Sequence, residues 1–146
     1  MTRHDDSTMS DTPDYSERRD LERRAEVVNA NDNSVYISIH QNCFPTGQPS
    51  GPLVIYSHHE ESEKLGKPTQ QNLITTLHSD SRRLAEPSLD KNYVLSHVNC
   101  PAILIECGFV SNFSDMEKLK TDEHQTALAA VIMASFLQYT ENSRYI

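Results

Sequence analysis

The chain has 146 residues and a formal net charge of −8, from 21 acidic and 13 basic side chains. This length suits one hydrophobic core, so we expect residues 1–146 to form a single domain. The acidic balance argues against nucleic acid as a partner, because proteins that bind it carry clustered Lys and Arg. No apolar run approaches the roughly 20 residues needed to cross a bilayer, and the first residues are too polar for a secretory signal.

The three cysteines, Cys43, Cys100 and Cys107, are too few and too irregularly spaced to predict a disulfide framework. We expect free thiols, with Cys107 packed as a small apolar side chain. A thiol nucleophile with His97 as its base is disfavoured, because no basic cluster in the sequence adjoins either Cys43 or Cys100.

The first half of the chain predicts a helix, two strands and a second helix. Residues 1–15 are polar and predict a loop or a loosely held arm. Helical spacing of apolar residues from Ser16 onward predicts an amphipathic helix. Alternation over residues 35–40 predicts a strand, and residues 53–57 predict another after a turn-rich loop.

The second half begins with a helical pattern that contains Gly66 and Pro68, where we expect a kink or a late start. Residues 81–92 predict an exposed connection and residues 93–97 a short edge segment. The strongest strand is AILIECGF, apolar on both faces like an inner strand of a parallel sheet.

Two helices are predicted after this strand. Ser114 with Glu117 fits a capping box for a short helix, and Thr121 opens a longer one. Strands that alternate with helices indicate an α/β layer structure.

Two apolar strands end on polar side chains, at His40 and Glu106. Ligand sites of open α/β sheets lie outside the carboxyl ends of the strands, so the two side chains would share a crevice if these strands are parallel neighbours. A hydrogen-bonded structural role is the alternative for His40, whereas a buried carboxylate such as Glu106 is costly without a partner, a metal or a function. Asn42 could orient a substrate or stabilise a turn. The adjacent His58 and His59 point in different directions, which disfavours a shared metal ion.

Several motifs give the chain a family resemblance from Thr2 to about Tyr139. They are TR at Thr2 and Arg3, ERRAEVVNAN, VYISIHQN, SEKLG, PAILIECGFVSN and HQTALAAVI. This set resembles the zinc-dependent N-acetylmuramoyl-L-alanine amidases of the type 3 family, and among them the spore-cortex, germination-specific branch. The resemblance implies a mixed, mostly parallel sheet flanked by helices, of the phosphorylase/hydrolase-like kind. It also implies hydrolysis of the amide between N-acetylmuramic acid and L-alanine of peptidoglycan, outside the cytoplasmic membrane or in the developing spore.

The resemblance also assigns roles to three residues. His40 matches a ligand of the family's Zn²⁺, Glu106 matches the catalytic glutamate, and Asn42 is a candidate substrate-binding residue. Zinc with an open position activates water and polarises a carbonyl, and a glutamate can move the protons. The family's first strand, first helix and two of its three metal ligands have no counterpart in this sequence, and Ser96 stands where the family usually has Arg.

These departures favour a truncated amidase catalytic domain, with the chain a fragment of a longer enzyme, and they lead to three further expectations. The alternative to an active enzyme is an inactive truncated homologue that binds peptidoglycan fragments. Replacement ligands from His4, Asp5 and Asp6 are disfavoured against a solvated polar arm. A sheet edge left open by a lost strand invites dimerisation.

Overall fold

The computed structural model describes residues 16–78, 80–89 and 92–143 of the chain. The elements are, in order, α1 (Glu17–Asn29), β1 (Tyr36–Asn42), β2 (Leu53–Tyr56), α2 (Ser62–Leu77), β3 (Glu86–Pro87), α3 (Tyr93–His97), β4 (Ala102–Phe109), α4 (Phe113–Leu119) and α5 (Asp122–Ser143). The predicted arm over residues 1–15 lies outside the described residues, and the single domain stays a prediction.

The described strands form one mixed sheet in the order β1-β4-β2-β3. β1 pairs with β4 in parallel, β2 pairs with β3 in parallel, and β2 pairs with β4 antiparallel. The prediction of a mixed, mostly parallel sheet flanked by helices is therefore confirmed. β4 is an inner strand, as its apolar composition predicts.

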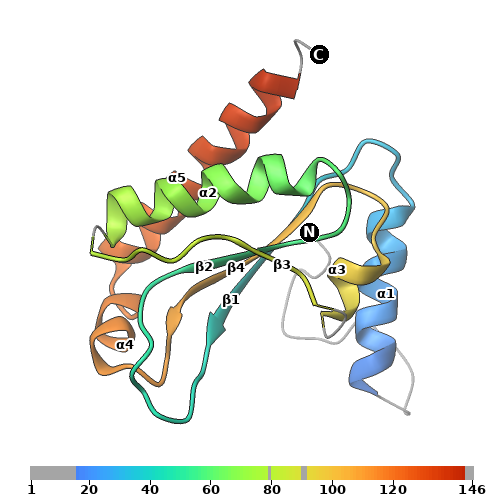
Figure 1. Ribbon diagram of the computed structural model, residues 1–146. Coiled ribbons are helices and arrows are strands. Elements are labelled where there is room, and N and C mark those ends of the chain that lie inside the picture. Colours follow the sequence, from blue (N-terminus) through green and yellow to red (C-terminus); the bar gives the residue numbers. More distant parts are fainter. Residues whose placement is uncertain (1–15, 79, 90–91, 144–146) are drawn as a thin grey trace.

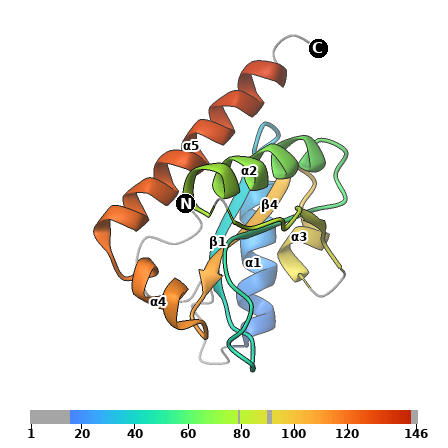
Figure 2. The same ribbon diagram turned by 60° about the vertical axis from the view of Figure 1, so that its left-hand side comes forward.

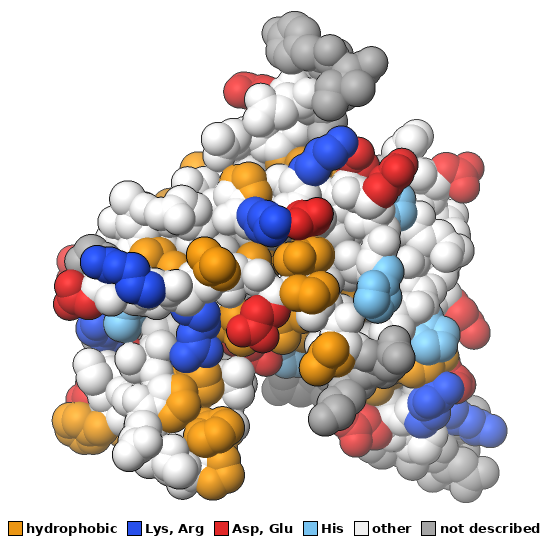
Figure 3. Space-filling view, in the orientation of Figure 1, with side chains coloured by type: hydrophobic (Ala, Val, Ile, Leu, Met, Phe, Trp, Pro, Cys, Tyr) orange, Lys and Arg blue, Asp and Glu red, His pale blue; other side chains and the backbone are white. Residues whose placement is uncertain are grey.

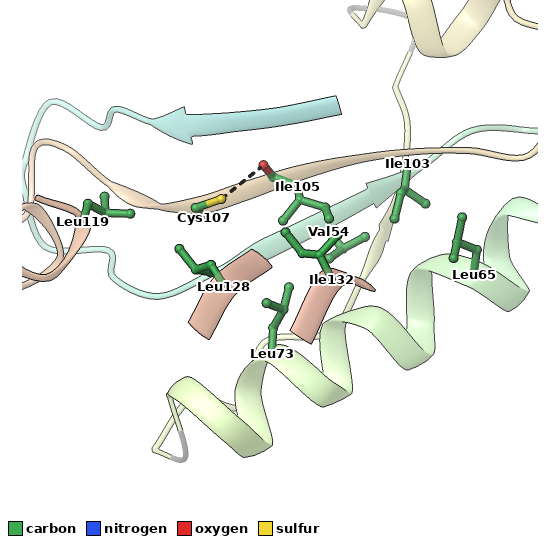
Figure 4. Close-up of a cluster of buried hydrophobic side chains, with 9 residues drawn as sticks. All are labelled: Val54, Leu65, Leu73, Ile103, Ile105, Cys107, Leu119, Leu128 and Ile132. Carbon is green, nitrogen blue, oxygen red and sulfur yellow. Dashed lines mark hydrogen bonds between the residues drawn. The ribbon is translucent and has the colours of Figure 1, made fainter. Parts of the chain in front are cut away.

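One face of the sheet is covered by α2 and α5, which lie together above it in Figure 1. Ile103 and Ile105 of β4 point toward these helices and are fully buried. They pack with Leu65 and Leu73 of α2 and Ile132 of α5, and Figure 4 shows these side chains converging between the helices and the strands. This cluster is the larger of the two hydrophobic cores that the described residues form.

The opposite face is covered by α1 and α3, which lie on the other side of the sheet from α2 in Figure 2. Alternation along β4 sends Ala102 and Leu104 to this side, where they meet Ala25 and Val28 of α1 and Leu95 of α3. Because side chains pack on both faces of β4, the position of this strand is fixed between the two helical layers.

The helix starts agree in part with the predicted capping residues. The Ser16 side chain accepts a hydrogen bond from the Arg19 N–H and caps α1, as expected. The predicted capping box at Ser114 is wrong. Asn112, directly before the first residue of α4, is the cap. Its side-chain oxygen accepts hydrogen bonds from the N–H groups of Ser114 and Asp115.

Two features of the middle of the chain differ from the predictions. α2 begins at Ser62 with Pro68 inside it, so the late start is wrong, whereas the alternative, a kink at this proline, stays a prediction. The Thr69 hydroxyl donates to the Leu65 carbonyl beside this proline, and the buried face of α2 continues on both sides of it. Residues 93–97 form the short helix α3 in place of an edge segment, because Val94 and Leu95 are both buried and adjacent, which a helix packed on α1 can satisfy.

β1 is an edge strand of the sheet formed by the described residues. Its Ile39 side chain points to the face covered by α5, yet it is 63% exposed. An unpaired edge with an exposed isoleucine is a site where another strand can add. Dimerisation through this edge stays a prediction.

Candidate catalytic site

His40 and Glu106 are register partners on the neighbouring parallel strands β1 and β4. Paired residues of adjacent strands lie about 5 Å apart and present their side chains to the same face of the sheet. That face is the one covered by α1 and α3, and the pair lies near the carboxyl end of both strands. The two strands are thus parallel neighbours, which is the condition under which His40 and Glu106 were expected to share one side of the sheet.

Glu106 is half-buried, and its Oε2 atom is fully shielded from solvent. Among the described residues this oxygen has no hydrogen-bond partner. Burial raises the pKa of Glu106 above its ordinary value, because the charged form loses hydration. A buried carboxylate oxygen without a hydrogen-bond partner is rare in protein cores, and such groups are found more often at functional sites.

His40 is largely exposed at the end of β1. Partial burial, and then the positive charge of Arg24 on α1, lower the pKa of His40. The neutral imidazole is therefore favoured, and this is the form that accepts a proton or binds a metal ion. The strand fixes the position of His40, while α1 sets its electrostatic surroundings.

Asn42 ends β1 and is engaged in the turn that follows. Its side-chain oxygen accepts a hydrogen bond of 2.8 Å from the Cys43 N–H, and its main-chain oxygen accepts one of 2.8 Å from the Val110 N–H. These bonds fit the turn-stabilising interpretation. The substrate-binding role of Asn42 stays a prediction.

The loops after β1 and β4 run side by side beyond this pair, and the Phe44 N–H donates to the Ser111 hydroxyl. These loops expose the large apolar side chains of Phe44 and Val110, and Phe113, the first residue of α4, is 75% exposed beside them. Apolar side chains gather at the lower left of Figure 3, over α4 and these loops, and the surface is notched between this lobe and the lobe of α1 and α3.

A buried aspartate, which the sequence analysis missed, fixes the end of β4. The Asp115 Oδ2 accepts hydrogen bonds from the Phe109 N–H at 2.9 Å and the Gly51 N–H at 2.8 Å. A side chain at Gly108 would lie 3.2 Å from the same oxygen. Asp115 therefore ties the strand that carries Glu106 to the loop before β2.

The remaining chemically suggestive residues have structural surroundings. The His59 Nδ1 atom accepts from the Glu61 N–H in a turn, and the His97 ring stacks on Tyr93 with centroids 3.9 Å apart. All three thiols are free, as expected, and burial raises the pKa of the Cys107 thiol to about 11. His4, Asp5 and Asp6 lie outside the described residues.

The described residues do not by themselves make a zinc site. No group of three His, Cys, Asp or Glu side chains among them is placed to hold a metal ion. A catalytic zinc needs three protein ligands, and His40 supplies one imidazole. Within the described parts of the chain, no helix is long and apolar enough to span a membrane.

A family model described as N-acetylmuramoyl-L-alanine amidase matches residues 1–138. The chain belongs to this amidase family. The match includes both strands of the His40–Glu106 pair, and it confirms the resemblance drawn from the HQN and ECGF motifs.

Individual members of the amidase family give the same result. The germination-specific N-acetylmuramoyl-L-alanine amidase of Bacillus subtilis is 33% identical over 143 residues, which are 95% of this chain and 60% of the relative. The CwlD amidase of Clostridioides difficile, solved in complex with the GerS lipoprotein, is 28% identical with a TM-score of 0.87, over 96% of this chain and 74% of that one. The N-acetylmuramoyl-L-alanine amidase from Clostridium difficile 630 is also 28% identical, with a TM-score of 0.72 over 83% and 65% of the two chains. The chain thus spans 60% of the length of its curated relative from B. subtilis.

Proposed function

We propose that this chain is an N-acetylmuramoyl-L-alanine amidase that hydrolyses the amide between N-acetylmuramic acid and L-alanine in peptidoglycan. The observation that supports it best is the pairing of His40 with Glu106 on adjacent parallel strands, with the Glu106 Oε2 atom buried and unpartnered among the described residues. The family match and the germination-specific relative support the substrate class. Action on cell wall or spore cortex, outside the cytoplasmic membrane, is part of the same proposal.

Glu106 is the proposed proton carrier of the reaction. Its carboxylate takes a proton from the attacking water and delivers it to the amide nitrogen as the C–N bond breaks. The products are the carboxylate of the lactyl group and the free amino group of L-alanine, so one water is consumed for each bond cleaved. A raised pKa suits this role, because a general base works best when its pKa approaches the working pH.

His40 is the proposed metal-binding residue and Asn42 the proposed substrate-binding residue, both by family position. Zinc is the metal that the resemblance implies. The described residues supply one of its three protein ligands, so no step of the chemistry above is assigned to the metal.

A second candidate function is a non-catalytic module that binds peptidoglycan fragments. The observation that favours it is the lack, among the described residues, of a three-donor metal site beside Glu106. Such a module would bind the substrate and lack turnover.

The two functions are separated by one experiment on purified chain. A disaccharide peptide from digested peptidoglycan is incubated with the chain and Zn²⁺, and the products are identified by mass spectrometry. The proposal predicts free disaccharide together with a peptide that begins at L-alanine. Intact substrate, with binding still detected by calorimetry, would reject the enzyme in favour of the binding module.

A further inference from the structure

A cavity of about 340 Å³ lies next to His40, on the sheet face that α1 and α3 cover. Tyr36 and Ser38 of β1 and Leu104 of β4 form its floor, and His40 lies at one end. The volume falls within the range of small-molecule sites, about 300–1,000 Å³. The cavity therefore adjoins the proposed catalytic pair along the same face of the strands.

The wall of the cavity contributed by α1 holds a rigid ion pair. Arg24 Nε and Nη2 each lie 2.7 Å from Oδ2 of Asp20, a residue that is 5% exposed. Among the described residues the Nη1 atom of Arg24 has no acceptor, so the guanidinium keeps donors for a ligand while its position is fixed. This pre-organisation reduces the entropy lost on binding.

The charges of the lining nearly offset one another. Asp20 and Arg24 form an ion pair, and Glu17 is the remaining carboxylate of the lining. Such a lining disfavours an anionic ligand. Asn92 and Ser38 add neutral hydrogen-bonding groups, which suit hydroxyl and amide groups.

The rest of the lining is apolar. Leu21, Val94, Leu95 and Leu104 contribute aliphatic surface beside the rings of Tyr36 and Tyr93. An aliphatic patch accommodates a methyl group and the C–H face of a sugar ring, while the neighbouring polar groups bind its hydroxyls. The lining of the cavity therefore suits an uncharged, polyhydroxylated ring with one small apolar substituent.

We propose that this cavity is a saccharide subsite that binds an N-acetylated hexosamine unit of the glycan strand beside His40 and Glu106. This inference rests on the proposed amidase function, since it assigns one part of that substrate to one part of the site. The acetamido methyl meets the leucine side chains, and the ring hydroxyls bind Arg24 and Asn92.

The test measures binding without cleavage. The ¹⁵N-labelled chain is titrated with tri-N-acetylchitotriose and followed by NMR, in parallel with cellotriose, which lacks acetamido groups, and with the stem peptide alone. We expect chitotriose to shift the amide signals of Ser38 and Leu104. Cellotriose should bind about fivefold or more weakly, as expected for the loss of one hydrogen bond and its methyl contact.

Matched variants locate the site. Asn92→Ala should weaken chitotriose binding about fivefold, the effect of one neutral hydrogen bond. Asn72→Ala is the control, because Asn72 is also half-buried and donates to Ser135 and Gln138 on the side of α2 and α5. Asn92 lines the cavity, and its amide nitrogen lies 3.5 Å from the Ser88 hydroxyl. Circular dichroism checks that both variants are folded.

The proposal is overturned if chitotriose shifts no cavity signal, if the peptide shifts them instead, or if Asn92→Ala and Asn72→Ala bind alike. The outcome is independent of turnover. Chitotriose in the cavity without amide cleavage would refute the proposed function alone, whereas cleavage without sugar in the cavity would refute this inference alone.

Discussion

The buried carboxylate of Asp115 gives the sharpest stability prediction. Asp115 is 4% exposed, and its Oδ2 atom accepts from two main-chain donors that belong to segments far apart in the sequence. These donors are the N–H groups of Phe109 at 2.9 Å and Gly51 at 2.8 Å. Asp115→Ala removes the acceptor and leaves both donors without it.

The expected loss follows from the number of bonds. A hydrogen bond to a charged group contributes about 1.5–3 kcal/mol, and a buried donor left unpaired costs a similar amount. Removal of the carboxylate also relieves its desolvation, which offsets part of the loss. We therefore expect Asp115→Ala to lower the free energy of unfolding by about 3–4 kcal/mol.

Urea unfolding followed by far-ultraviolet circular dichroism measures this change. The transition midpoint should fall with little change in its slope, because the surface exposed on unfolding is nearly the same. Glu117→Ala on the same helix is the control. Its exposed pair with Lys120 predicts a change within about 0.5 kcal/mol. A loss below about 1 kcal/mol for Asp115→Ala would refute the reasoning.

Three further predictions concern thiol reactivity, pH and packing. At pH 8, iodoacetamide should modify the exposed Cys43 and spare the buried Cys100 and Cys107. The Cys107 thiol has a pKa of about 11, which leaves about one thiolate in a thousand at this pH. Three labels per native chain by mass spectrometry would contradict this. Because burial raises the pKa of Glu106 in the folded chain, the carboxyl costs stability as pH rises above its ordinary value of 4.5. Between about pH 4 and pH 7, the free energy of unfolding of the unaltered chain should therefore fall relative to that of the Glu106→Gln variant. Urea titrations that find no such relative change would exclude this burial penalty. Leu73→Ala should lower the free energy of unfolding by about 2–5 kcal/mol, since Leu73 is fully buried in the larger core; a loss within about 1 kcal/mol in the same urea assay would show that the site repacks.

The elements that the sequence predicts well are those whose pattern is long enough to show a period. α1 and α5 extend over 13 and 22 residues, and β4 is a continuous apolar run with a carboxylate near its end. α3 has five residues, which is too short to distinguish a helical from a strand period. Its helical state depends on packing against α1, which is a tertiary contact.

The candidate site was predictable in part for the same reason. Both His40 and Glu106 follow apolar strand residues, and the rule for the carboxyl ends of strands predicts their common edge. The buried ion pair of Asp20 with Arg24 and the hydrogen bonds of Asp115 to the Phe109 and Gly51 N–H groups were not predicted. Asp20 and Arg24 look like an ordinary exposed helix pair in sequence, and only the approach of α1 to the sheet buries Asp20.

The most direct test of the account is the rate of amide cleavage in the Glu106→Gln variant on a disaccharide-peptide substrate. General acid–base catalysis contributes about 10²–10⁴-fold, so kcat should fall by at least about 100-fold while substrate binding is retained. Glu63→Gln, at an exposed glutamate paired with Lys67 on α2, is the control and should keep its rate. A Glu106→Gln variant that turns over substrate within about twofold of the unaltered chain would remove Glu106 from the mechanism and contradict the central claim.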